Sequence, residues 1–337
     1  MTIFIIFIIV AALVFCYING FHDSANSIST IVSTRVLSPL HAVLWAAFFN
    51  FVAAFGLGTF VAKTVGSGLI DLSFVTPSVI LSGLLGAIIW DIITWWLALP
   101  TSSSHALIGG YAGAALARVG WKALIVGGWL KTALFIFLAP LIGFAVAWIL
   151  MFAIIRLFAK QPPALMDKHL RKLQLFSAAI YSLGHGTSDA QKTMGIIAGL
   201  LFITPQYAAL VTAANGTMMF PFWLLLLCHF TIALGTLFGG WRIVRTLGGR
   251  ITNLKPVGGF CAETAGAITL FGAALLGVPV STTQTITGAI VGVGMTRRSS
   301  SVRWVVAGRI LWAWILTIPA SALIAAVIFL LISAAGY

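Results

Sequence analysis

Charged side chains are scarce in this chain, and acidic ones most of all. Six of its 337 residues are Asp or Glu, and charged residues together make up 7% of the sequence. The apolar fraction of 61% lies well above the ~45–50% usual in soluble proteins, which excludes a soluble globular domain. Cysteine is rare too. Cys16, Cys228 and Cys261 are scattered through apolar sequence, so neither a disulfide framework nor a metal-binding spacing is indicated.

Long apolar runs take the place of the missing charge, and the mean hydropathy is +1.10. Several runs approach or exceed the ~17–20 apolar residues that cross a bilayer core. They include Ile3–Ile18, Val79–Leu99, Thr132–Ile155 and Leu311–Leu331. Because such runs recur along the whole length, the sequence predicts a multi-pass, all-α protein of the plasma membrane. We expect about 10–12 transmembrane segments, some of them interrupted helices or re-entrant hairpins.

The net charge of +13 comes from Lys and Arg residues that gather between the apolar runs. That placement is typical of the basic loops that membrane proteins keep in the cytoplasm, and it favours the lipid bilayer rather than nucleic acid as the partner. The clusters are residues 118–131, 156–172, 242–255 and 297–309. We interpret residues 156–172, which contain Pro162 and Pro163, as a cytoplasmic linker between an N-terminal repeat at 1–155 and a C-terminal repeat at 173–337.

Two acidic residues stand where a membrane tolerates charge poorly. Asp23 lies in GFHDSANSIST and Asp189 in GHGTSDAQKTMG, and we predict that each segment is a polar, glycine-containing break in an apolar stretch. An ionisable group at membrane depth usually marks a substrate or ion pathway. The two segments resemble each other and recur in the same order as a second matching pair. This order predicts two repeats around one binding site, and whether they are inverted depends on an odd number of spans in each half.

The second pair consists of hydroxyl-rich segments that each follow a proline. PTSSSHALIGG starts at Pro100 and PVSTTQTITG at Pro279. Because Ser and Thr are good N-caps, a helix starting there would aim free N–H groups and its positive end at the hydroxyls, which suits a small oxyanion. The alternative is that these hydroxyls merely join membrane helices. The candidate anion-binding residues are Thr101, Ser102, Ser103, Ser104, Ser281, Thr282, Thr283 and Gln284.

The acidic segments offer ligands for a coupling cation or proton. Asp23 and Asn26 are one helical turn apart and therefore share a face. Their hard oxygens suit Na⁺, Mg²⁺ or a proton, and a dianion entering a low dielectric needs such a partner. Asp189 differs, because Lys192 follows it by three residues. One arrangement is an internal ion pair, which is either purely structural or leaves the ammonium as a fixed cation in the site. The other is direct contact between the ammonium and the anion.

Other polar residues are weaker candidates for the pathway. Asp91 lies in IIWDIITWW, where capping a helix contact is the alternative, and Glu263 lies in GFCAETAG at the start of a span. His22, His105 and His185 flank the signature segments. They could carry protons or act as hydrogen-bonded packing residues.

At these positions the sequence resembles the PiT family of inorganic phosphate transporters. The resembling elements lie in family order over most of the chain: NGFHDSANSISTIVSTR at 19–35, PTSSSHALIGG at 100–110, GHGTSDAQKTMGIIAGLL at 184–201, AETAG at 262–266 and GVPVSTTQTITGAIVG at 277–292. The resemblance implies a helical carrier of two inverted repeats that binds phosphate and coupling cations between interrupted helices and hairpins. Many relatives have Asn where this chain has Lys192, so a full set of sodium sites is not implied.

The sequence therefore predicts a secondary active symporter that imports inorganic phosphate, free or as a complex with a divalent metal, coupled to H⁺ or Na⁺. No cofactor and no enzymatic activity are expected, and assembly into a homodimer is left open. A sulfate permease of the same fold is the nearest alternative, because some small bacterial members carry that anion. A passive anion channel is another. An intramembrane hydrolase using Ser103 or Ser104 with His105 or His185 is disfavoured, since the hydroxyl segment is duplicated without its histidine.

Overall fold

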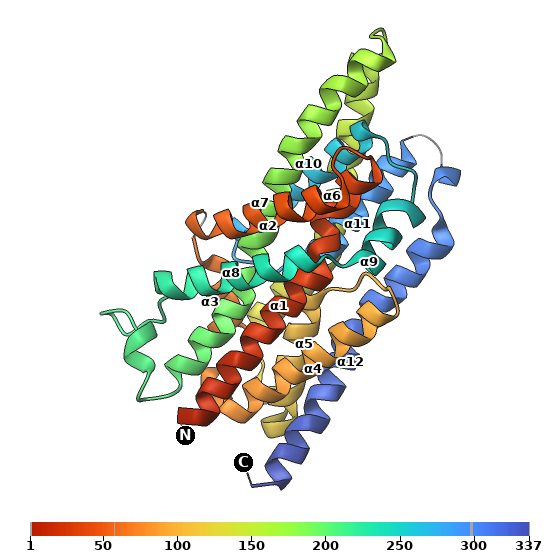
Figure 1. Ribbon diagram of the computed structural model, residues 1–337. Coiled ribbons are helices and arrows are strands. Elements are labelled where there is room, and N and C mark those ends of the chain that lie inside the picture. Colours follow the sequence, from red (N-terminus) through yellow and green to blue (C-terminus); the bar gives the residue numbers. More distant parts are fainter. Residues whose placement is uncertain (1, 57, 297–298, 337) are drawn as a thin grey trace.

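The chain is almost entirely helical in the computed structural model, which describes residues 2–56, 58–296 and 299–336 (Figure 1). Strand-like pairing in these ranges is limited to the isolated bridges Ile70–Leu124 and Thr212–Met218. The all-α prediction is confirmed. The main helices are α1 (Thr2–Ser33), α2 (Pro39–Val52), α3 (Phe60–Lys63), α4 (Pro77–Trp96), α5 (Ser103–Val119), α6 (Val126–Leu157), α7 (Pro163–Phe202), α8 (Phe222–Phe238), α9 (Trp241–Arg245), α10 (Pro256–Leu275), α11 (Thr282–Met295) and α12 (Trp304–Ala334).

The two halves of the chain repeat the same succession of helices. A long helix, α1 or α7, is followed by a pair bent at a short break, α2 with α3 or α8 with α9. Next come a 20-residue helix that begins at a proline, α4 or α10, and a short helix capped by a serine, α5 or α11. Each half ends in a long helix with an internal proline, Pro140 in α6 or Pro319 in α12. This succession supports the predicted duplication.

The first helices of the two halves, α1 and α7, are antiparallel neighbours. Thr34, just beyond the end of α1, donates a hydrogen bond to Gln174 in the first part of α7, whereas Asp23 lies beside Asp189 farther along it. Figure 1 shows the same opposition, with α1 rising from the N terminus and α7 descending beside it. The opposite directions support the inverted relation of the halves, which stays a prediction.

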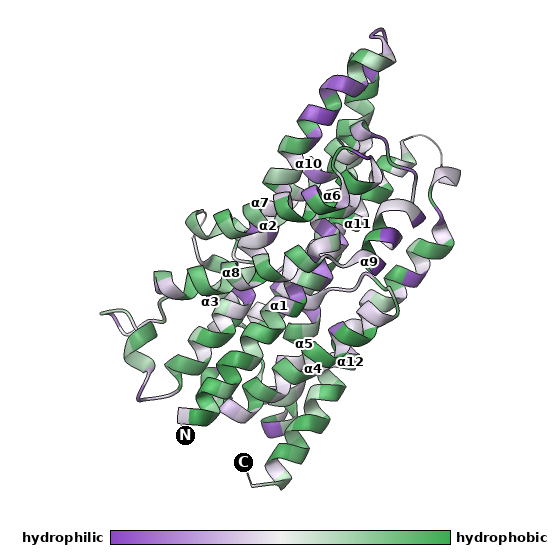
Figure 2. Ribbon diagram, viewed as in Figure 1, coloured by the Kyte–Doolittle hydropathy of each residue, from purple (hydrophilic) through white to green (hydrophobic). Residues whose placement is uncertain are grey.

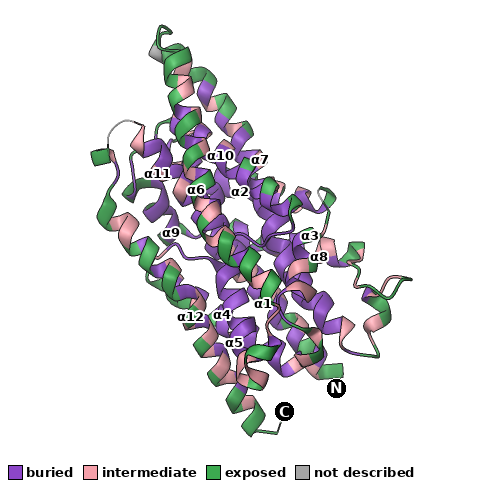
Figure 3. Cartoon of the chain, turned by 180° about the vertical axis from the view of Figure 1, so that it is seen from behind, coloured by how far each residue is buried: buried purple, intermediate pink, exposed green. Residues whose placement is uncertain are grey.

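The short helices pack on the long helix of the other half. α5 packs against α12, and α11 packs against α6. Glycines allow this approach: a β-carbon at Gly113 of α5 would clash with the Ala322 carbonyl oxygen, and one at Gly292 of α11 would clash with the Phe144 carbonyl oxygen. The crossed packing holds both short helices in the interior, while α6 and α12 expose much of their surface (Figure 3).

The polar segments around Asp23 and Asp189 interrupt the apolar sequence but not the helices. α1 and α7 each run through the segment without interruption. Their glycines serve close packing instead. A β-carbon at Gly20 would collide with the Ile232 carbonyl oxygen of α8, and one at Gly186 would lie 2.6 Å from the Asn50 carbonyl oxygen of α2. The interruptions lie between the helices of the bent pairs and before α5 and α11.

Five described helices are long and apolar enough to cross a membrane, namely α1, α4, α6, α10 and α12. The number rises to seven if each bent pair counts as one span, and α8 with α9 bends by 61°. The lower end of the expected ten to twelve segments is reached only by also counting the short helices α5 and α11 and the polar helix α7. Helices that carry buried polar residues have low hydropathy and are therefore not recognised as membrane spans from their composition.

The basic segment predicted as a linker is largely helical. α6 ends at Leu157 and α7 begins at Pro163, where proline suits the first helical position, so the connection is residues 158–162. Figure 2 shows hydrophilic residues concentrated on this protruding hairpin. Since α6 is one unbroken helix, the basic cluster at 118–131 lies at its opposite end, and the basic clusters do not all share one membrane face. Residues 297–298 of the last cluster lie outside the described residues.

Candidate functional site

Two helix N-termini meet inside the protein, at the starts of α5 and α11. The N-cap Ser102 of α5 accepts a hydrogen bond from the His105 backbone N–H at 3.1 Å. The N-cap Ser281 of α11 accepts one from the Gln284 backbone N–H, also at 3.1 Å. The two starts adjoin, because Gln284 Nε2 lies 3.4 Å from His105 Nδ1. Their free first-turn N–H groups and positive helix ends therefore gather in one region.

The carboxylates of α1 and α7 face these helix starts. Asp23 Oδ1 accepts a hydrogen bond from Ser103 Oγ at 3.3 Å, and Asp23 Oδ2 lies 3.5 Å from Thr282 Oγ1. Thr282 Oγ1 also lies 3.2 Å from Asp189 Oδ2. A hydroxyl has a single proton, so Thr282 can satisfy only one of the two carboxylates at a time. The other carboxylate remains open to a proton or a cation.

Asn26 and Lys192 stand three residues after their aspartates, and each contacts the hydroxyl segment of the opposite half. Asn26 Nδ2 donates to Thr283 Oγ1 at 2.9 Å and to Thr282 Oγ1 at 3.2 Å. Lys192 Nζ donates to Ser104 Oγ, the residue that corresponds to Thr283 in the other segment. The two halves therefore meet through equivalent contacts, one made by an amide and one by an ammonium.

The ammonium of Lys192 is fully coordinated. Besides Ser104 it donates to Asp189 Oδ1 at 2.6 Å and to the Val280 carbonyl oxygen at 2.8 Å. These three oxygens use all three of its N–H donors. Of the two arrangements that the sequence left open, the structure has the internal ion pair, and direct contact with an anion would require one of these bonds to be exchanged.

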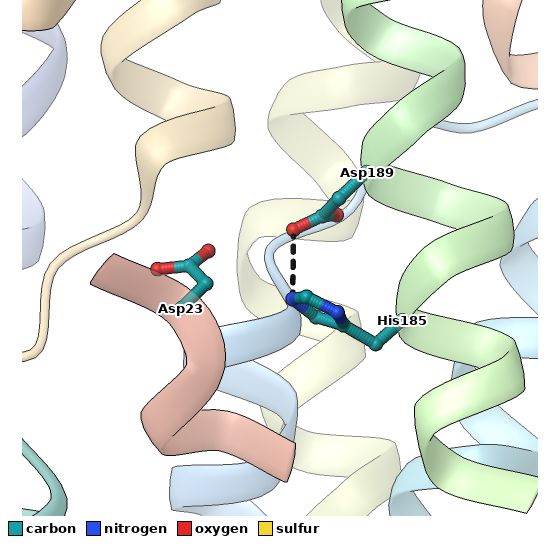
Figure 4. Close-up of side chains that lie close together, drawn as sticks. All are labelled: Asp23, His185 and Asp189. Atoms are coloured by element: carbon teal, nitrogen blue, oxygen red, sulfur yellow. Dashed lines mark ion pairs between the residues drawn. The ribbon is translucent and has the colours of Figure 1, made fainter. Parts of the chain in front are cut away.

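Two histidines extend the carboxylate pair. His22 Nδ1 lies 2.8 Å from Asp23 Oδ1, and His185 Nε2 lies 3.4 Å from Asp189 Oδ2. Figure 4 shows Asp23 of α1 opposite Asp189 and His185 of α7. Ligand atoms of these three residues lie within 4.8 Å of one another. With two carboxylates, this set fits a small hard cation.

The cluster is closed off from solvent and holds more carboxyl groups than ammonium groups. Asp23, Asp189 and Lys192 are at most 1% exposed, and the hydroxyl segments at most 2%. Asp91 is also completely buried, so three carboxyl groups lie beside one ammonium in this part of the described chain. Adding a buried dianion would be unfavourable unless cations or protons entered with it.

The remaining predicted residues lie at the edge of the cluster or apart from it. Thr101 Oγ1 donates to Thr94 Oγ1 at 2.9 Å, behind the start of α5. Glu263 belongs to a separate buried group, in which it accepts hydrogen bonds from Thr30 at 2.6 Å and from Ser177 at 2.5 Å. The sequence therefore located the central residues, while Glu263 does not join them.

Three neighbours of the cluster escaped the sequence analysis. Thr94 Oγ1 lies 3.2 Å from His22 Nε2, Asn50 Oδ1 lies 3.1 Å from His185 Nδ1, and Tyr181 donates to the Thr282 carbonyl oxygen at 3.2 Å. Asn50 is an isolated polar residue in an apolar run, whereas Thr94 and Tyr181 lie near other polar residues of their own helices. None belongs to a segment that recurs in the other half of the chain. The sequence therefore does not distinguish it from a polar residue that hydrogen bonds only within its own helix.

The geometry contradicts the hydrolase alternative. That alternative paired Ser103 or Ser104 with His105 or His185 as the base. In the described part of the chain, Ser103 instead donates to Asp23, Ser104 accepts from Lys192, and His105 contacts Gln284. Neither serine is hydrogen bonded to either histidine.

Comparison with known proteins agrees with this arrangement. A sequence profile described as "Phosphate transporter family" matches residues 19–325. The chain is 56% identical over 322 residues to a probable low-affinity inorganic phosphate transporter of Rhizobium meliloti (strain 1021), covering 96% of this chain and 94% of the relative. It is 42% identical over 330 residues to a protein of the same description from Bacillus subtilis (strain 168), covering 97% of both.

A solved structure titled "The sodium-dependent phosphate transporter" has a similar fold. Its TM-score is 0.85, the match covers 99% of both chains, and the sequences are 24% identical. At this identity the likeness shows the fold alone. The relatives that share the sequence over nearly its full length are transporters and not enzymes.

Proposed function

Because this chain belongs to the phosphate transporter family, we propose that it is a secondary active symporter that carries inorganic phosphate inward across the plasma membrane. One observation supports this most directly: two capped helix starts and two carboxylates converge in a fully buried cluster. Partial positive charge at the helix ends favours a multivalent anion, and the carboxylates favour its coupling partners.

In this proposal the hydroxyl segments hold the phosphate. Ser103, Ser104 and Thr282 lie at the first turns of α5 and α11, where hydroxyls and unpaired backbone N–H groups can surround a tetrahedral oxyanion. Alternating access would follow from one part of the bundle rocking against the other around this site. The closed arrangement described here would then be an intermediate of the transport cycle.

The coupling ion binds beside the phosphate in this proposal. Asp23 and Asn26 would hold a proton or a small cation, with Asp189 across from them, while Lys192 supplies a permanent positive charge. Since the carboxylates already outnumber the ammonium, a dianion needs at least one accompanying positive charge. H⁺ and Na⁺ both satisfy this requirement, and a divalent metal travelling with the phosphate would also satisfy it.

The carboxylates favour phosphate over sulfate. Monohydrogen phosphate carries a proton that it can donate, whereas sulfate at neutral pH only accepts hydrogen bonds. Asp23 and Asp189 face the hydroxyl segments and could accept that bond, while they would repel sulfate. A site that pairs with a donor on its ligand discriminates strongly against an analogue without it.

Uptake of labelled phosphate into proteoliposomes tests the function. The purified protein should accumulate phosphate when an inward proton or sodium gradient is imposed, and excess unlabelled sulfate should compete poorly. Asp23→Asn should abolish accumulation without unfolding the protein, because the buried amide takes up no proton and carries no charge to balance a coupling cation. Accumulation that sulfate but not phosphate inhibits would contradict the choice of substrate, and equilibration without accumulation would indicate a channel.

A further inference from the structure

One carboxyl group beside the cluster has no hydrogen-bond partner. Asp91 lies in α4, is 0% exposed, and neither of its side-chain oxygens is hydrogen bonded to another described residue. A buried carboxylate that is ionised and without donors is very unfavourable, whereas its protonated form is not. The other carboxylates of the cluster are paired: Asp23 with His22, and Asp189 with Lys192.

The surroundings of Asp91 also disfavour its ionised form. From α1 and α7, the carboxylates of Asp23 and Asp189 are close enough to repel a negative charge there. His22 of α1 is the nearby group that can become positive, but its ring nitrogens are engaged by Asp23 and Thr94.

Among the residues that the structure describes, the other helices that pack on α4 supply no free cation to Asp91. On α5, Ser103 is near Asp91 but directs its hydroxyl to Asp23, and His105 contacts Gln284. On α9, Arg242 donates to the Trp96 carbonyl oxygen at 2.9 Å and stacks on Trp95 and Trp96. On α12, the titratable residue is Arg309, which is exposed.

We propose that Asp91, rather than Asp23, is the binding site for the proton that is transported with phosphate, an inference that rests on the proposed function. The carboxylate takes up one proton from the side where the site is open and water can solvate its ionised form. It carries the proton as a neutral carboxylic acid through the closed state and releases it on the other side. No covalent bond to phosphate forms, and one positive charge crosses for each cycle of Asp91.

The position of Asp91 couples the proton to the anion. Ser103, a proposed phosphate ligand, donates to Asp23 and is also near Asp91, so phosphate bound there adds negative charge near Asp91. That charge favours the protonated acid, and by linkage the protonated acid favours phosphate binding to the same extent. The two ligands therefore enter the closed state together, which is the requirement for symport.

The test compares net accumulation with exchange in proteoliposomes. Asp91→Asn has nearly the same shape and cannot bind or release a proton. With a proton gradient, accumulation of labelled phosphate should fall to background. Exchange of external labelled phosphate for internal unlabelled phosphate, at equal concentrations and without a gradient, should continue, because it needs no change of protonation. Asp71→Asn, the same substitution at an exposed carboxylate, is the matched control and should retain both activities.

Each outcome has a separate meaning. If the wild-type protein neither accumulates nor exchanges phosphate, the proposed function fails. If it accumulates phosphate with a sodium gradient and ignores a proton gradient, phosphate transport stands and the role of Asp91 is refuted. Proton-driven accumulation by Asp91→Asn at the wild-type level also refutes it. Loss of both activities in a variant that elutes as a folded protein assigns Asp91 to anion binding, which again overturns the proposal.

Discussion

Replacing Lys192 by Asn should make phosphate binding depend on an added cation. The substitution turns the Asp189 segment into a copy of the Asp23–Asn26 arrangement of the other half. The lost ammonium makes three bonds, of which the one to Asp189 is a buried ion pair of 2.6 Å. Removing one partner of such a pair costs about 3–5 kcal/mol. A proton or mobile cation can partly replace it, so the lower end of that range applies.

That cost falls on the stability of the fold. For phosphate affinity the relevant loss is the attraction between the ammonium and a nearby anion, about 3 kcal/mol for unit charges at the effective dielectric of a protein site, which corresponds to binding roughly a hundredfold weaker. Binding of labelled phosphate to the purified protein measures it directly, in buffer containing only choline and again with sodium. We expect Lys192→Asn to bind about a hundredfold more weakly in choline and to regain much of that affinity with sodium. Lys172→Asn, the same change at an exposed position, should bind as the wild type does.

The double variant separates charge balance from simple damage. Asp189→Asn with Lys192→Asn removes both members of the pair and leaves no unpaired buried charge, so its affinity in choline should exceed that of Lys192→Asn alone. If Lys192→Asn binds phosphate normally in choline, the ammonium is not part of the charge balance at this site. If the double variant is as impaired as the sum of both single losses, Lys192 acts through packing.

Two further predictions concern the hydroxyl segments and an exposed turn. Ser103→Ala combined with Thr282→Ala removes two hydrogen-bond donors to a charged ligand, each worth about 1.5–3 kcal/mol. The half-saturation concentration for phosphate should therefore rise at least tenfold, with the coupling ion unchanged. An unaltered half-saturation concentration would contradict phosphate binding at these hydroxyls. The pKa of exposed Asp71 is held below its ordinary value by hydrogen bonds from the backbone N–H and hydroxyl of Ser73. These bonds therefore stabilise the turn above the ordinary pKa and are lost as the pH falls through the lowered one. At neutral pH, the hydrogen-exchange rate of the Ser73 amide should be lower in the wild-type protein than in Asp71→Asn, and in acid the two rates should be equal. Equal rates at both pH values would show that the carboxylate does not hold the turn.

The central residues of the site could be predicted because polar residues in an apolar chain are costly. Asp23, Asp189 and the two hydroxyl segments stood out against their surroundings, and their pairing in the same order indicated a single site. The continuity of the helices could not be predicted in the same way. Hydropathy falls where α1 and α7 carry buried polar side chains, and the sequence does not reveal that distant segments satisfy them.

The neighbours of the site were equally hidden. Asn50 and Thr94 lie in largely apolar helices, and their roles depend on which ring nitrogen of His185 or His22 lies beside them. Glu263 matched a motif of the family, yet its partners Thr30 and Ser177 place it in a different group. Packing alone decides which residues far apart in the sequence become hydrogen-bond partners.

The amino-acid sequence by itself determined that the chain is helical, lies in a membrane and carries a duplicated set of helix starts and carboxylates, because composition, proline positions and N-cap residues act locally. The tertiary structure alone decided that α5 and α11 cross to the long helix of the other half, that Lys192 is enclosed by three oxygens, and that Asp91 is left without a donor. Those outcomes depend on close packing at glycines and on the distance between groups far apart in the chain, and electrostatic interactions in a buried site vary steeply with that distance.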